Sequence, residues 1–105
     1  MVHHVILWKL KESLSVEGKK QVALGIKDHL EALVGKVPGL VSLKIIINEM
    51  ESSSADVMLD SVLESRDALE SYQNHPEHVH AADTYVRPYT EVRMCMDYEN
   101  ESDFR

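Results

Sequence analysis

Residues 2–10 read VHHVILWKL, and apolar side chains in this stretch alternate onto both sides of an extended chain. The even-numbered side chains from His4 to Leu10 point to one side, whereas Val5 and Leu7 point to the other. A strand that is apolar on both faces is typical of a sheet covered on both sides. The stretch therefore predicts a strand near the middle of such a sheet.

Three more strands are predicted around it. Residues 56–63, DVMLDSVL, repeat the two-sided pattern and favour a second central strand. Residues 41–49 and 90–98 are apolar mainly on one side, as edge strands of the same sheet are expected to be. Pattern and position thus agree for all four segments.

Two segments between these strands are predicted to be helical. Ser15 is a suitable N-cap, and the helix that follows is predicted to end before Pro38. Residues 65–72 predict a short helix, and Pro76 favours a break at His75 followed by a new helix to about residue 86. The apolar positions that recur at helical spacing in the first helix are Val22, Ile26, Leu30, Leu33 and Val37.

The order of these elements predicts an α+β fold. Strand, helix, strand, strand, helix, strand is the order of a ferredoxin-like βαββαβ protomer. Such a protomer has a four-stranded antiparallel sheet with both helices on one face, and its first and third strands are central. The division predicted here is one domain over residues 1–99 and an acidic tail over residues 100–105.

One face of that sheet has no helix left to cover it. Each large apolar side chain left in water forgoes roughly 1.5–3 kcal/mol. A twofold homodimer that packs sheet against sheet would cover the face, because such an interface is self-complementary. The residues expected on it are Ile6, Trp8, Leu43, Ile45, Leu59, Val92 and Met94.

Composition narrows the classes of partner. Eleven basic against eighteen acidic residues give a net charge of -7, which opposes binding to phosphate backbones and anionic lipid surfaces. We therefore expect neither nucleic acid nor a membrane as a partner. The single cysteine, Cys95, cannot form an intramolecular disulfide, and no apolar run is long enough to span a bilayer, so a cytoplasmic protein is expected.

Several segments resemble one known family. They are HHVILWKLK at residues 3–11, VLESRDALESYQNHPEHV at 62–79, HPEHVHAADTYVRPY at 75–89 and CMDYE at 95–99. Together they resemble the stress-responsive dimeric α/β-barrel family over residues 2–99. The resemblance implies two ferredoxin-like protomers whose sheets close into one barrel, in agreement with the dimer predicted from the uncovered face.

The resemblance also implies candidate catalytic residues. One plant member, olivetolic acid cyclase, cyclises a linear polyketide, and its tyrosine and histidine acid/base pair is similar to Tyr72 and His78 here. A further pocket histidine on its first strand resembles His4. The chain departs from that pattern at Val57, where the cyclase has a histidine, and near Leu30, where it has a tyrosine.

Four functions follow as hypotheses, one leading and three alternative. The leading one is binding of a small apolar or aromatic molecule in a cleft formed by His4, Tyr72 and His78, with Ile6, Trp8, Val57 and Leu59 lining it. A cofactor-independent, cyclase-like enzyme using Tyr72 and His78 as acid and base is the first alternative. A structural protein with a filled barrel is the second, in which Tyr72 and His78 satisfy backbone groups at the helix break and Trp8 fills the core. An oxygenase, by analogy of fold alone, is the third.

Metal and cofactor chemistry have little support in the sequence. His75, His78 and His80 lie within six residues, but His80 points elsewhere on a helix and no cysteine accompanies them, so we expect no metal site. No glycine-rich phosphate loop, nucleophile elbow or zinc motif occurs, and no cofactor is predicted.

Overall fold

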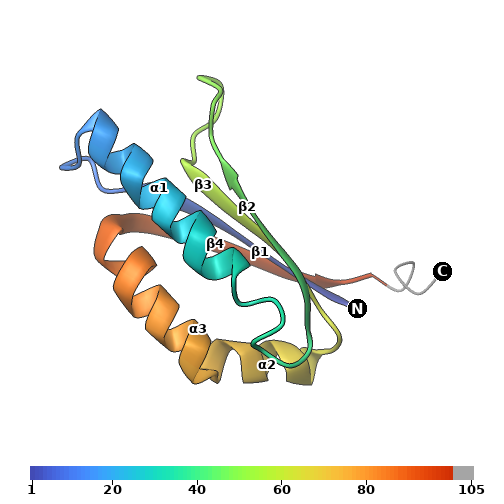
Figure 1. Ribbon diagram of the computed structural model, residues 1–105. Helices are drawn as coiled ribbons and strands as arrows, with labels where there is room; N and C mark the ends of the chain where they lie inside the picture. Colours follow the sequence, from blue (N-terminus) through green and yellow to red (C-terminus); the bar gives the residue numbers. More distant parts are fainter. Residues whose placement is uncertain (101–105) are drawn as a thin grey trace.

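The computed structural model describes residues 1–100 and has the predicted order of elements (Figure 1). Of the predicted tail, Asn100 is described and residues 101–105 lie outside the described residues. None of the helices formed by residues 1–100 has the length and apolarity needed to span a bilayer. The elements are β1 (Val2–Leu10), α1 (Val16–Glu31), β2 (Leu40–Ile47), β3 (Val57–Leu63), α2 (Arg66–Asn74), α3 (Pro76–Ala81), the π-helical turn η1 (Ala82–Val86), the 3-10 turn η2 (Arg87–Tyr89) and β4 (Thr90–Glu99).

The four strands form one antiparallel sheet in the order β2-β3-β1-β4. The two strands with two-sided apolar patterns, β1 and β3, are central, as predicted. Ile6 pairs with Leu59 of β3 on one side and with Cys95 of β4 on the other. The α+β, ferredoxin-like topology is therefore confirmed.

The helices cover one face of the sheet, with α1 beside the α2 and α3 segments (Figure 1). The core lies between these layers and includes the even-numbered residues of β1 and the odd-numbered residues of β3. Its most enclosed apolar side chains include Ile26 and Leu30 of α1, Leu59 and Leu63 of β3, and Tyr72 of α2. The apolar stripe of α1 and one face of the central strands thus bury each other.

The predicted membership of the uncovered face was partly wrong. Ile6, Trp8, Leu43, Ile45 and Leu59 lie on the helix-covered face and are at most 7% exposed. Because Trp8 pairs with Arg93 and Ile6 with Cys95, the odd-numbered residues of β4 share that face with them. Val92 and Met94 therefore point to the opposite side. The prediction had placed β4 one residue out of register with β1, and so had assigned residues of both faces to one face.

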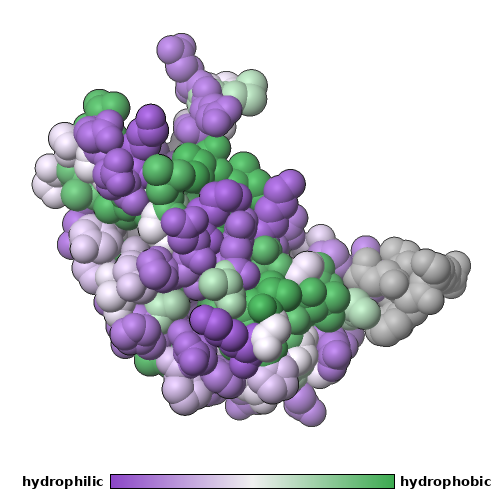
Figure 2. All heavy atoms as spheres, in the orientation of Figure 1, coloured by the Kyte–Doolittle hydropathy of each residue, from purple (hydrophilic) through white to green (hydrophobic). Residues whose placement is uncertain are grey.

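An apolar uncovered face nevertheless exists; it includes Val92 and Met94 as predicted, and its other members differ from the predicted ones. We call it the open face; Met94 and Met96 on it are 66% and 69% exposed. Figure 2 shows the molecule in the orientation of Figure 1. Hydrophilic side chains gather over α1, and hydrophobic side chains lie beside them. By strand alternation and register, the apolar members of the open face are Val5, Leu7, Ile46, Met58, Val62, Val92, Met94, Met96 and Tyr98.

The first helix ends earlier than its apolar spacing predicts. The Ser15 hydroxyl accepts a hydrogen bond from the Gly18 N–H and caps α1 as expected, but the helix stops at Glu31 instead of continuing to residue 37. Leu33 and Val37 remain buried in the turns that follow. Apolar spacing had identified positions that face the core, and these do not require a continuous helix.

A second turn brings this segment close to α2. Gly39 has a φ of +85°, and a Cβ added there would lie 2.7 Å from the Cβ of Ala68. Glycine is required at this position both by the left-handed backbone and by the close approach. The contact fixes the start of β2 against the helix that carries Tyr72.

Candidate functional site

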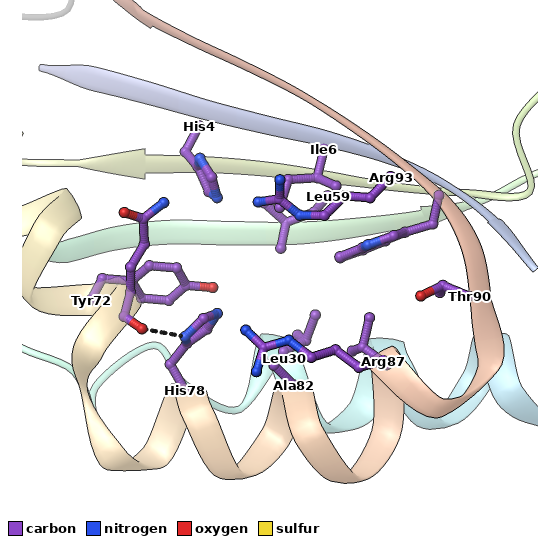
Figure 3. A pocket seen from close by; sticks show the side chains of 13 residues that line it. His4, Ile6, Leu30, Leu59, Tyr72, His78, Ala82, Arg87, Thr90 and Arg93 are labelled. Carbon is purple, nitrogen blue, oxygen red and sulfur yellow. Dashed lines mark hydrogen bonds between the residues drawn. The ribbon is translucent and has the colours of Figure 1, made fainter.

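A small cavity lies between the sheet and the helices, and we call it the sheet–helix cavity (Figure 3). Its volume is about 80 Å³, which is the size of a site for a small molecule. Residues from β1, β3, β4 and every helical segment contribute to its lining, which comprises His4, Ile6, Trp8, Leu30, Leu59, Tyr72, Gln73, His78, Ala82, Val86, Arg87, Thr90 and Arg93.

Tyr72 is the most enclosed polar residue of this cavity. It lies near the end of α2, and its side chain is 0% exposed. Its hydroxyl has no hydrogen-bond partner among the described residues, although a buried polar group without one costs about 1–3 kcal/mol. Burial raises the pKa of Tyr72, so the phenol stays protonated near neutral pH and can donate a hydrogen bond.

His78 faces Tyr72 across the break between α2 and α3. The break forms because His75, which precedes Pro76, adopts an extended backbone and caps the new helix by accepting a hydrogen bond from the Glu77 N–H. The two rings lie 4.3 Å apart between centroids, with a tilt of 44°. The predicted kink therefore brings the phenol and the imidazole together.

The protonation of His78 follows from its surroundings. Its Nδ1 lies 3.2 Å from the Gln73 carbonyl oxygen, which can only accept, so Nδ1 carries the proton and Nε2 is left with its lone pair. Burial lowers the pKa of His78, and the nearby charges of Arg87, His4 and Arg93 lower it further, against the opposing effect of the Gln73 carbonyl. His78 is therefore a neutral base at pH 7.

His4 forms the sheet side of the cavity. It is 1% exposed, and its ring centroid lies 6.1 Å from that of Tyr72 in an edge-to-face arrangement. Its Nδ1 is hydrogen-bonded to the Asp97 carboxylate, and its backbone carbonyl accepts a bond of 2.8 Å from the Ser61 hydroxyl. The Asp97 contact orients the ring, and the Ser61 bond holds the backbone of His4; Nε2 is left for the cavity.

One group of possible metal ligands occurs within residues 1–100, and it differs from the histidines considered in the sequence. The Cys95 Sγ lies 3.7 Å from the His4 Nδ1 and 3.5 Å from the Asp97 Oδ1. Burial and the neighbouring Asp97 raise the pKa of Cys95, which disfavours the thiolate that a metal would require. His75, His78 and His80 do not bring their ligating atoms together.

The structure brings most of the predicted site residues into one place. The predicted residues that line the sheet–helix cavity are His4, Tyr72, His78, Ile6, Trp8 and Leu59. Val57 is buried two residues from Leu59 on β3, where it pairs with Trp8, and it lies outside the lining. Sequence reasoning missed Asp97, Arg87 and Arg93. The register of β4 against β1 identifies two of them, since it places Asp97 opposite His4 and Arg93 opposite Trp8.

The sequence was compared with models of known families and with curated proteins. The sequence model of the Stress responsive A/B Barrel Domain (Dabb) matches residues 2–100. A search among curated proteins found no match.

Solved structures are similar over nearly the whole chain. A dimeric protein of unknown function with a ferredoxin-like fold from Bacteroides fragilis is 31% identical, with a TM-score of 0.89, over 94% of this chain and 95% of that chain. A Dabb family protein from Mesorhizobium loti is 19% identical, with a TM-score of 0.70, over 94% and 95%. The hydroxynitrile lyase from Passiflora edulis is 17% identical, with a TM-score of 0.73, over 95% and 94%. The last two show a shared fold.

The buried Tyr72 hydroxyl predicts an unusual pair of stability effects. Tyr72→Phe should leave the free energy of unfolding unchanged or raise it, because no hydrogen bond is lost. Ser61→Ala is the matched control, because the buried Ser61 hydroxyl donates a hydrogen bond to the His4 carbonyl. This variant should lower the free energy of unfolding by about 1 kcal/mol. Urea unfolding measures both, and a loss of more than 1 kcal/mol in Tyr72→Phe would contradict the assignment.

The lowered pKa of His78 predicts a loss of stability in acid. In the unfolded chain His78 is protonated near its ordinary pKa of 6.5, whereas in the folded protein its pKa is lower. The free energy of unfolding should therefore fall as the pH drops below about 6.5, and the fall should be smaller in His78→Gln. His80→Gln, which removes an exposed histidine from the same helix, should keep the wild-type slope in urea titrations from pH 8 to 5. Equal slopes in both variants would refute the role of His78.

Proposed function

Because the chain belongs to the stress responsive A/B barrel domain family, we propose that it is a homodimer that binds a small, largely apolar molecule in the sheet–helix cavity. The observation that carries the proposal is the Tyr72 hydroxyl, a buried donor without a partner among residues 1–100. A ligand that accepts its hydrogen bond would remove a cost that the protein alone bears. The single Cys95 as a free thiol is compatible with a reducing, cytoplasmic location.

The cavity favours a compact ligand with one hydrogen-bond acceptor. Ile6, Trp8 and Leu59 supply apolar walls, while Tyr72 and His78 present polar atoms at one end (Figure 3). Ligand sites commonly combine apolar walls with a few such placed polar groups. At about 80 Å³, the cavity fits a short carbonyl compound and excludes a long polyketide from its interior.

The open face supports a second copy of the chain as the partner. Its exposed large apolar residues, which include Met94 and Met96, would each gain roughly 1.5–3 kcal/mol if fully buried. Isologous packing of two open faces would bury them with no further protein. The similar Bacteroides fragilis structure is described as dimeric and has the same ferredoxin-like fold.

Acid/base catalysis is the second candidate function, and the geometry of His78 favours it. The free Nε2 of a neutral imidazole can take a proton from a carbon beside a carbonyl, or from a hydroxyl, while the Tyr72 phenol donates to the oxygen on which negative charge develops. The similar fold of the Passiflora edulis hydroxynitrile lyase shows an enzyme on this scaffold. A purely structural role has less support, because the interior is not filled.

Binding can be tested with two molecules of matched shape. Cyclopentanone should bind about fivefold more tightly than methylenecyclopentane, because only the ketone accepts the Tyr72 hydrogen bond. Tyr72→Phe should remove that difference and keep the binding of the hydrocarbon. Amide chemical shifts in an NMR titration give both affinities and locate the site.

Two outcomes of that titration would count against ligand binding in the cavity. One is the absence of shifts around Tyr72 and His78 at millimolar ligand. The other is an unchanged preference for the ketone in Tyr72→Phe. Ser61→Ala removes a buried hydroxyl outside the cavity lining and should retain the preference.

The dimer predicts a specific effect of a charge on the open face. Wild-type protein at micromolar concentration should have twice the monomer mass of 12.0 kDa by light scattering, and Met94→Asp should have the monomer mass. The physical reason is that dimerisation would bury the introduced carboxylate. Val16→Asp is the control, because Val16 is 89% exposed at the start of α1, and it should remain dimeric. A monomeric wild type would exclude the proposed assembly.

A further inference from the structure

The sheet–helix cavity is positively charged although the protein is acidic. Its lining contains two arginines, Arg87 and Arg93, and no carboxylate, whereas the whole chain has a net charge of -7. Within residues 1–100, two carboxylates are paired with side chains of the lining: Asp97 with His4 and Asp83 with Arg87. The cavity thus holds cationic groups in excess of their partners.

Arg93 is the clearest unmatched cation. It lies on β4 opposite Trp8, and its side chain lines the cavity. Arg66 pairs with Glu99 and Arg87 with Asp83, but Arg93 has no carboxylate partner within residues 1–100. The Arg93 side chain interacts with Cys95, which leaves its positive charge without a carboxylate. A guanidinium without a carboxylate partner can bind a planar anion through two parallel hydrogen bonds.

The two guanidinium groups lie on the side of the cavity where the Tyr72 hydroxyl lies. Figure 3 shows the guanidinium of Arg93 reaching toward it from the sheet side and that of Arg87 from the helix side, with His78 beside Tyr72. The positive charges of Arg87 and Arg93 also lower the pKa of His78, which places both within electrostatic range of the imidazole. An anionic ligand in this cavity would therefore lie among two guanidinium-bearing side chains and the phenol.

We infer that the ligand of this cavity is a small organic carboxylate, bound by Arg93 and Arg87 with an oxygen on the Tyr72 hydroxyl. This inference rests on the proposed function and names its ligand class. The remaining walls, among them Ile6, Trp8 and Leu59, are apolar and would hold a short hydrocarbon chain. They also discriminate against inorganic phosphate, whose oxygens on every side would lose hydration against them.

A matched pair of ligands tests the charge requirement. At pH 7.5 and low salt, 3-methylbutanoate should bind at least tenfold more tightly than 3-methylbutanamide, which has the same shape without the charge. Isothermal titration, with NMR to locate the site, measures both, and inorganic phosphate serves as a third probe. Phosphate should bind more weakly than the carboxylate.

Substitutions identify the group responsible. Arg93→Gln should reduce the preference for carboxylate over amide to less than threefold, and Arg93→Lys should retain part of it, because lysine keeps the charge and loses the planar fork. Arg87→Gln should have the smaller effect, since Asp83 already pairs with Arg87. Lys36→Gln, which removes the same charge from an exposed turn outside the lining, should behave as wild type. Thermal unfolding confirms that each variant is folded.

The outcomes separate this inference from the proposed function. Equal binding of the carboxylate and the amide, or tighter binding of phosphate, would overturn the carboxylate assignment while cyclopentanone binding still supports a ligand site. An unchanged preference in folded Arg93→Gln would overturn the role of Arg93. If neither these probes nor cyclopentanone bind, the ligand site itself fails.

Discussion

The pairing register of β1 against its two neighbours is the constraint on which the rest of the structure depends. Ile6 lies between Leu59 and Cys95, and this single alignment turns His4 toward the helices and sets it beside Asp97. A shift of one residue would send every side chain of the strand to the opposite face. The core, the cavity and the open face all follow from that alignment.

Much of the fold could be predicted from sequence because the relevant signals are local. Two-sided alternation in residues 2–10 and 56–63 identified the central strands, and Pro76 located the break that brings His78 to Tyr72. The end of α1 was missed, because buried positions such as Leu33 and Val37 can keep helical spacing after the helix has ended. Apolar spacing reports burial, and only indirectly backbone conformation.

The candidate site was harder to predict in full because it depends on pairings between distant segments. Asp97 and Arg93 lie more than eighty residues from the β1 residues that they oppose, and alternation within β4 does not state which of its faces joins His4. The same ambiguity grouped Ile6, Trp8 and Leu59 with Val92 and Met94, although only the last two lie on the uncovered face. Residue types alone indicated His4, Tyr72 and His78 through resemblance, whereas the charged groups around them required the register.

The exposed edge strand β4 has a consequence for how the molecule works as an assembly. Arg93, Cys95 and Asp97 face the helix side, while Met94 and Met96 alternate with them on the open face, and nothing within residues 1–100 covers the outer edge. A partner that packs against the open face of β4 would restrict the motion of the side chains on its other face. Association between subunits and occupancy of the binding site would then be thermodynamically linked through ten residues of shared backbone, each favouring the other.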